Sequence, residues 1–238
     1  MSKSVLLLLI ISLLGNLFGL LVLFKAYDYR KKMILAWAQS DEWASNLQAR
    51  LTSSNDKAEA VDLVLLGASI TAHWDAARQI PGRKIVNKGI DGHYASQLLL
   101  RFQHDVVDLH PRAVAIKLCE MNFAHEVPIS ISQDNIKMLA SLAQANSIRP
   151  LIATTIPVTA AYDAKHNRKI NRQIREFNQW LKDYVSKNKY DLLDLAGALD
   201  DGAGNLRAEC SDDGVHPNSA GYAIMTQVLS QKLAAEEI

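Results

Sequence analysis

Short apolar runs alternate with longer amphipathic stretches through the chain from residue 61 onward. The apolar runs are Val61–Leu66, Lys84–Val86, Ala113–Leu118, Pro150–Thr154 and Asp191–Leu195. The stretches between them have apolar positions at helical spacing, and they cover residues 70–78, 94–109, 131–146, 166–187 and 217–234. Buried strands that alternate with helices are typical of a parallel sheet covered on both faces. The pattern therefore predicts an α/β domain over residues 59–238, with three α/β/α layers and about five parallel strands.

The N-terminal region has a different pattern, because the segment from Val5 to Phe24 contains no charged residue. A helix of this length spans about 30 Å, which is the hydrocarbon thickness of a bilayer. A cleaved signal peptide has a shorter apolar region and ends in a small-x-small cleavage site, which the residues after Phe24 do not offer. We therefore expect residues 1–24 to form a single-pass transmembrane helix that anchors the protein to a membrane.

Residues 25–58 are polar to amphipathic and predict a juxtamembrane helix followed by a linker. The large apolar side chains at roughly helical spacing are Trp37, Trp43, Leu47 and Leu51. Most positive charges near the apolar segment follow it, at Lys25 and at Arg30 to Lys32, so the positive-inside rule favours a cytoplasmic domain. Many domains with such an anchor face outward instead, and the side of the membrane stays open.

Composition, charge and cysteine spacing argue against a nucleic-acid-binding protein and against a zinc site. Apolar residues make up 49% of the chain, charged residues 21%, and the formal net charge is +1. This is an ordinary globular mixture without the basic excess of a nucleic-acid-binding protein. Cys119 and Cys210 lack the paired spacing of a zinc site, and the histidines form no HExxH motif. We expect two unpaired thiols, no metal and no nucleic-acid partner.

Three polar segments carry possible chemistry, because they follow predicted strands or precede the last helix. Ser69 stands at a strand-to-helix turn, Gly89 lies in a glycine-containing turn after the second strand, and Asp213 stands three residues before His216. Each has a structural alternative: a helix N-cap, a tight turn and an Asx-type turn, respectively. Together, however, a serine, an aspartate and a histidine in this order supply the nucleophile, the orienting acid and the base of a triad.

These segments resemble the SGNH hydrolase superfamily, also called GDSL-type lipases and esterases, over roughly residues 61–230. The similar segments are residues 64–71, residues 86–102, Thr155 to Pro157 and residues 213–218. The resemblance implies a flavodoxin-like SGNH hydrolase fold and no cofactor. It implies that Ser69 is the nucleophile, His216 the base and Asp213 the orienting acid.

The resemblance also implies an oxyanion hole, with backbone N–H donors from Ser69 and Gly89. The family's third motif, Gly-x-Asn-Asp, is altered, since Met121 falls on the asparagine position and Asn122 on the aspartate position. A thioether cannot donate a hydrogen bond, whereas a one-residue bulge would bring the Asn122 amide to the site. We therefore expect the loop after the third strand to bring Asn122 toward Ser69; the alternative is that Asn122 caps the next turn.

The sequence thus predicts a membrane-anchored carboxylic ester hydrolase that cleaves O-acyl or O-acetyl groups of a lipid or a carbohydrate through an acyl-enzyme. Two alternatives stay open. A thioesterase or acyltransferase would use the same acyl-enzyme with another acceptor. A catalytically weak binding module would keep the fold and lose rate through the altered third motif.

Overall fold

The computed structural model describes residues 4–6, 12, 15–30, 61–125, 127–166 and 170–235. The chain divides into two units, Met1–Asp56 and Lys57–Ile238. Within the described residues, no helix has both the length and the apolarity that crossing a membrane requires. Residues 1–3, 7–11 and 13–14 of the expected anchor, and residues 31–58 of the expected juxtamembrane segment, lie outside the described residues.

Five parallel strands form one sheet in the order β2-β1-β3-β4-β5. They are β1 (Leu63–Gly67), β2 (Ile85–Gly89), β3 (Ala113–Lys117), β4 (Arg149–Ala153) and β5 (Asp191–Leu193). The prediction of about five parallel strands is confirmed, and each strand falls on one of the apolar runs. Because β2 and β3 flank β1 on opposite sides, the strand order reverses beside β1, where ligands bind in sheets of this kind.

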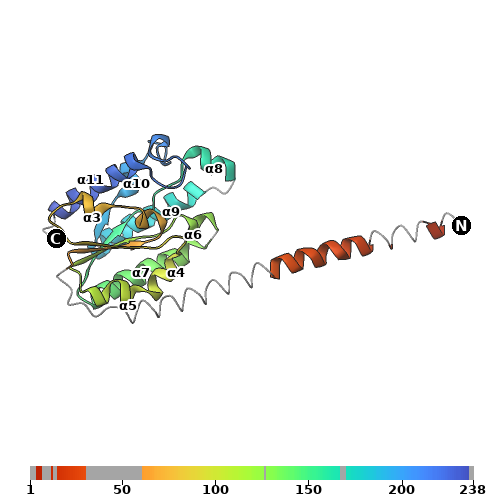
Figure 1. The fold of residues 1–238 in the computed structure, drawn as a ribbon, viewed down its shortest axis with the longest axis horizontal. Coiled ribbons are helices and arrows are strands. Elements are labelled where there is room, and N and C mark those ends of the chain that lie inside the picture. The colour runs from red at the N-terminus through yellow and green to blue at the C-terminus, as the bar shows by residue number, and fades with distance from the viewer. Residues whose placement is uncertain are drawn as a thin grey trace. The chain divides into compact units, whose positions relative to one another are not determined.

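Helices cover both faces of this sheet (Figure 1). One layer contains α2 (Ser69–Ala72), α3 (Ala76–Gln79), α10 (Leu195–Leu199) and α11 (Ser219–Ala235). The opposite layer contains α4 (Ala95–Leu100), α5 (Phe102–Asp105), α7 (Ile129–Ala145) and α9 (Ile170–Asn188). The remaining short elements are α6 (Met121–Ala124), α8 (Ala160–His166), and the 3₁₀ turns η1 (Val107–Leu109) and η2 (Ala208–Cys210).

Two hydrophobic cores follow from the alternation of side chains along each strand. Leu63 and Leu65 of β1 pack in the core under α11, whereas Val64 and Leu66 pack in the core above α7 and α9. All four side chains are almost completely buried. A strand that is buried on both faces reads as a continuous apolar run, which is why the sequence identifies these strands.

Two predicted helices are interrupted. The stretch over residues 70–78 breaks between α2 and α3, where the Asn87 side-chain amide donates to the carbonyls of Thr71 (2.6 Å) and Trp74 (3.0 Å). These bonds satisfy carbonyls that a continuous helix would use itself. The stretch over residues 94–109 breaks at Arg101, which lies between α4 and α5. Its side chain is fully buried.

The Arg101 guanidinium joins the carboxyl ends of two neighbouring strands. It donates to the carbonyl of Gly67 at the end of β1 (2.7 Å) and to the carbonyl of Lys88 in β2 (2.7 Å). It also pairs with the buried carboxylate of Asp105, which Lys88 approaches to 3.6 Å. A buried charge is tolerated only when it is paired and hydrogen-bonded, so this cluster requires all of these partners.

Replacing Arg101 should therefore destabilise the domain strongly. Arg101→Met should lower the free energy of unfolding by about 3–5 kcal/mol, because it leaves Asp105 buried without its main partner. Urea unfolding followed by circular dichroism would measure the loss. The matched control is Arg78→Met, since the Arg78 side chain is 87% exposed and its loss should change stability by less than about 0.5 kcal/mol. Equal effects of the two substitutions would contradict the role of Arg101.

Candidate active site

A serine hydroxyl from the beginning of the domain's sequence and an imidazole from near its end lie in contact at the carboxyl edge of the sheet. Ser69 Oγ lies 3.0 Å from His216 Nε2, and His216 Nδ1 lies 2.7 Å from Asp213 Oδ2. Because an ionised carboxylate only accepts hydrogen bonds, Nδ1 carries the proton, and Nε2 is then free to accept the Ser69 proton. The structure thus brings together Ser69, His216 and Asp213, which the sequence analysis selected.

The Asp213 carboxylate is held by its own segment of chain. Its Oδ1 accepts hydrogen bonds from the backbone N–H groups of Val215 and His216, both at 2.8 Å, and from the Ser211 hydroxyl at 3.2 Å. Partial burial raises the pKa of Asp213, but the hydrogen bonds from the His216 ring and these N–H groups outweigh it and lower the pKa to about 2. The Asx-type turn and the contact with His216 coexist, since each uses a different carboxylate oxygen.

Ser69 is the first residue of α2, and one residue, Ala68, separates it from the end of β1. Ala68 occupies the N-cap position, so Ser69 is not the helix cap that the sequence left as an alternative. At the first helical position, the Ser69 N–H has no acceptor within the helix. The hydroxyl and this N–H therefore belong to the same turn, in which Ser69 is half-buried and a helix N-terminus favours negative charge.

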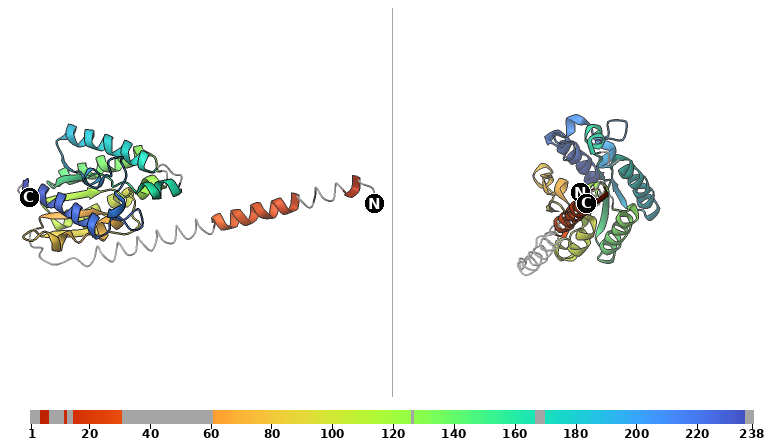
Figure 2. Two further views of the ribbon diagram at one scale, coloured as in Figure 1. Left: turned by 90° about the horizontal axis from the view of Figure 1, so that it is seen from above. Right: turned by 90° about the vertical axis from the view of Figure 1, so that its right-hand side faces the viewer.

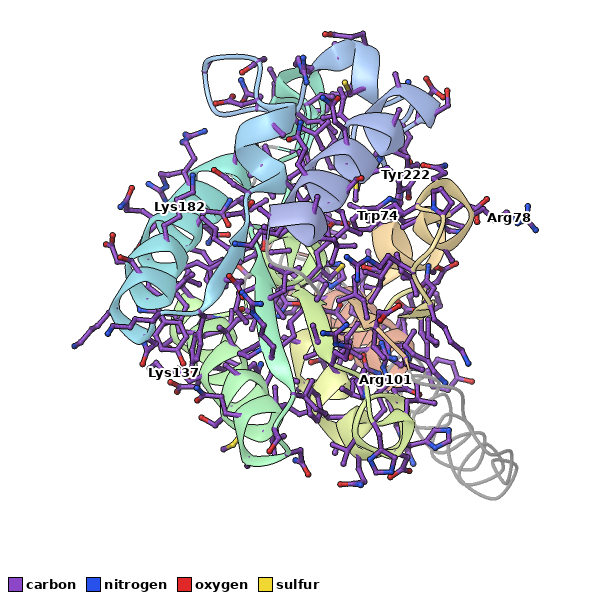
Figure 3. All side chains as sticks on the ribbon, turned by 90° about the vertical axis from the view of Figure 1, so that its left-hand side faces the viewer. Trp74, Arg78, Arg101, Lys137, Lys182 and Tyr222 are labelled. Carbon is purple, nitrogen blue, oxygen red and sulfur yellow. The ribbon has the colours of Figure 1, made fainter. Side chains whose placement is uncertain are left out.

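Two hydrogen bonds join the segment from Ser69 to Trp74 to α11, the helix that follows His216. Tyr222 donates from its hydroxyl to the carbonyl of Ile70 (3.1 Å), and Trp74 donates from Nε1 to Thr226 Oγ1 (3.0 Å). Figure 2 shows α11 in blue beside the orange segment with α2 and α3, and Figure 3 shows Trp74 and Tyr222 in this region. Burial, followed by the charges of Glu120, Asp91 and Asp213, raises the pKa of Tyr222, so its hydroxyl keeps its proton.

Gly89 lies at the end of β2, in register with Gly67 of β1. Its N–H donates to the Asn87 side chain at 2.8 Å, so this donor is already engaged. A Cβ on Gly89 would lie 2.1 Å from the backbone nitrogen of Ala72 in α2. Glycine is therefore required here because the end of β2 packs directly against the backbone of the helix that bears Ser69.

Asn122 lies in α6 and is almost completely buried. Its amide donates to the Ser132 hydroxyl of α7 at 3.4 Å, and its side-chain oxygen is buried without a hydrogen-bond partner. One of the two N–H donors of this amide is therefore engaged with Ser132. Neither the expected contact with Ser69 nor the alternative turn cap is among the hydrogen bonds of this side chain.

The sequence analysis missed two buried ion pairs beside the strand ends. Lys117 at the end of β3 pairs with Glu120 at 3.6 Å, and both side chains are about 95% buried or more. Arg101 and Asp105 form the second pair. The only signal for either pair is a charged residue inside an apolar run, such as Lys117 in β3 and Arg101 after Leu98 to Leu100.

The described part of the chain contains no cluster of three or more histidine, cysteine or carboxylate side chains that could hold a metal ion. Cys119 and Cys210 are both buried free thiols. The geometry around Ser69 is that of a hydroxyl activated by a base whose orientation a carboxylate fixes, which is the arrangement used for acyl transfer.

Comparison with known proteins points to the same chemistry. The model of the GDSL-like Lipase/Acylhydrolase family matches residues 42–224. No curated protein matches the chain.

Solved structures extend this similarity to the fold. A proposed acylhydrolase from Bacteroides fragilis is 28% identical with a TM-score of 0.69, and the match covers 84% of this chain and 97% of that one. A proposed lipolytic protein of the G-D-S-L family from Desulfitobacterium hafniense is 26% identical, with a TM-score of 0.64 and coverages of 73% and 99%. A GDSL-like lipase from Bacteroides thetaiotaomicron, 24% identical with a TM-score of 0.66 and coverages of 82% and 97%, shares the fold.

The bond between Tyr222 and Ile70 should tune the alignment of Ser69 with His216. Tyr222→Phe removes only a hydroxyl, and we expect a loss of about 1 kcal/mol in stability. We also expect kcat to fall about threefold to tenfold with little change in KM, because the substitution disturbs the alignment of reacting groups rather than binding. Steady-state kinetics on a chromogenic acetate ester would measure both constants.

Tyr190→Phe is the matched control. Tyr190 donates from its hydroxyl to Gln144 at 2.8 Å, but it directly precedes β5 and lies at the opposite end of the sheet from the strand ends that hold the site. Its removal should leave kcat unchanged. If both variants lowered kcat equally, Tyr222 would have no special relation to the site.

Proposed function

The chain belongs to the GDSL-like lipase/acylhydrolase family and is a carboxylic ester hydrolase, and we propose that Ser69, His216 and Asp213 form its catalytic triad. The observation that carries the proposal is the continuous line of hydrogen bonds from Ser69 Oγ through both ring nitrogens of His216 to Asp213. The proposed substrates are O-acyl or O-acetyl esters of a lipid or a carbohydrate.

The proposed reaction proceeds in two halves. Ser69 Oγ attacks the ester carbonyl while His216 Nε2 accepts the hydroxyl proton, and Asp213 stabilises the imidazolium that forms. Collapse of the tetrahedral intermediate breaks the bond to the alcohol, which leaves with the proton from His216. Water then attacks the acyl-enzyme, gives its proton to His216, and releases the carboxylic acid and the Ser69 hydroxyl.

The backbone N–H of Ser69 is the proposed oxyanion donor, since it lies on the turn that carries the nucleophile and has no acceptor within α2. Gly89 could contribute its N–H only after releasing the Asn87 side chain. Asn122 gives one of its two amide N–H donors to Ser132, and only the second could serve an oxyanion. Where that second donor does not reach the oxyanion, its absence costs about 2.7–4 kcal/mol of transition-state stabilisation and the enzyme is slower than one with the full set of donors.

Replacing the nucleophile tests the proposal directly. Ser69→Ala should lower kcat/KM for 4-nitrophenyl acetate by at least about 10³-fold, because no other hydroxyl is paired with the base. The same substitution should abolish covalent labelling by a fluorophosphonate, while the circular dichroism spectrum and the unfolding midpoint stay close to those of the wild type.

Ser230→Ala is the control, because Ser230 is an exposed serine on α11. It should leave both hydrolysis and labelling unchanged. A Ser69→Ala variant that stays active would rule out the triad, and a wild-type protein that neither hydrolyses the ester nor becomes labelled would favour a binding module.

We also propose that residues 1–24 anchor the protein in a membrane as a single helix. The support is the uncharged segment from Val5 to Phe24, which is long enough for a bilayer. The proposal leaves open which side of the membrane the hydrolase domain faces.

Membrane fractionation tests the anchor. The intact protein should stay in the membrane fraction through high-salt and alkaline washes, and mass spectrometry should find the uncleaved N-terminus. Leu13→Arg combined with Leu14→Arg should release much of the protein, because each arginine costs about 2.5–3.5 kcal/mol near the centre of a membrane helix. A mature protein that begins near residue 26 would show a signal peptide instead.

A further inference from the structure

A pocket of about 450 Å³ is lined by Asp213, whose carboxylate also bonds the His216 ring, while neither Ser69 nor His216 lines it. Its walls come from α8, from the segment after α10, and from the loop Ser211 to Gly214. This volume is within the range of about 300–1,000 Å³ that is usual for small-molecule sites. We call it the acid-side pocket.

The walls of the acid-side pocket are fastened to the triad loop. Thr159 donates from its backbone N–H to the carbonyl of Gly214 at 2.8 Å. A Cβ on Gly214, which has φ +86°, would lie 2.8 Å from Thr159 Oγ1 and 2.9 Å from Tyr162 Cβ. Leu206 donates from its N–H to the carbonyl of Val158 at 3.1 Å. Backbone contacts thus hold the pocket in place, and Asp213, the proposed orienting acid, forms part of its wall.

The lining combines ionic groups with small apolar surfaces. Asp201 and Lys165 are both exposed on the rim. Hydrogen bonds from the Asn205 side chain and from the N–H groups of Ala203 and Asn205 lower the pKa of Asp201 to about 2, so it accepts hydrogen bonds at neutral pH. Between these groups lie the side chains of Tyr162 and Ala161.

This lining fits a sugar better than an acyl chain. Sugar hydroxyls can donate to carboxylates and accept from an ammonium group, while the C–H face of the ring packs on aromatic and methyl surface. An acyl chain would gain only from the apolar part and would desolvate the charged groups without pairing them.

We propose that the acid-side pocket binds one sugar unit of a glycan whose ester, on a neighbouring unit, reaches Ser69. The proposal rests on the proposed esterase function and names its substrate class. Because Asp213 lines the pocket whereas Ser69 and His216 do not, a group bound in the pocket is not itself attacked. The substrate must therefore be longer than one sugar, and the pocket contributes binding energy at a distance from the reacting bond.

The first test compares substrates of two lengths with the full-length wild-type protein. The kcat/KM for O-acetylated cellotetraose should exceed that for O-acetylated glucose by at least about tenfold, because only the longer substrate reaches the pocket. Equal values for the two substrates, or no hydrolysis of either while 4-nitrophenyl acetate is cleaved, would overturn the proposal and leave the esterase function standing.

The second test blocks the pocket with a bulky side chain. Ala161 and Ala164 are exposed alanines of the same helix, α8, and only Ala161 lines the pocket. Ala161→Trp should lower the ratio of kcat/KM for O-acetylated cellotetraose to that for 4-nitrophenyl acetate by at least about tenfold, mainly through KM. Ala164→Trp should leave this ratio unchanged.

Two other outcomes would overturn the inference. An unchanged ratio in Ala161→Trp would show that the glycan does not use the pocket. A selective loss of activity on 4-nitrophenyl octanoate, with the cellotetraose ratio preserved, would make it a lipid-side subsite. Failure of the esterase function itself is distinguishable, because the wild-type protein would then not hydrolyse 4-nitrophenyl acetate, whereas failure of the triad would appear as hydrolysis that survives Ser69→Ala.

Discussion

The buried guanidinium of Arg101 is the constraint on which the rest of the site depends. Strands β1 and β2 both end beside Arg101, and the Gly67 carbonyl also accepts a hydrogen bond from the Ile90 N–H at 3.2 Å. Arg101 donates to the carbonyls of Gly67 and Lys88 at once, and Asp105 compensates its charge. Ser69, the proposed nucleophile, follows Gly67 by two residues, so the buried Arg101 helps to fix the position from which Ser69 leaves the sheet.

Two arrangements between nearby segments and one long-range docking then assemble the site. Asn87 bonds the carbonyls of Thr71 and Trp74 where α2 ends. Asp213 bonds the backbone and the ring of His216 within a single turn of chain. The docking of α11 on the segment with Ile70 and Trp74, through Tyr222 and Thr226, joins distant parts of the sequence. The precision of the contact between Ser69 and His216 therefore rests on a small number of packed, hydrogen-bonded residues.

The sequence predicted the sheet, and it selected the three residues that the structure brings together, because both leave local signals. Apolar runs mark strands that are buried on both faces, and the short spacing between Asp213 and His216 allows only local geometry. Asn122 and Gly89 were harder, because a donor's role depends on which acceptor lies nearest in space, and Ser132 and the Asn87 side chain are those acceptors. Arg101 lies within the similar segment 86–102, but its role was not predicted. Nothing in its neighbourhood along the chain reveals that its partners are the ends of two strands.

The separation of the two reacting groups along the chain has a consequence for synthesis. Ser69 and His216 are 147 positions apart, and His216 directly precedes the segment that leads into α11. A ribosome therefore releases Ser69 long before His216, its proposed base. With the proposed triad, the nascent polypeptide carries an unactivated alcohol until α11 has emerged and docked beside α2, so hydrolysis begins only after this late step of folding.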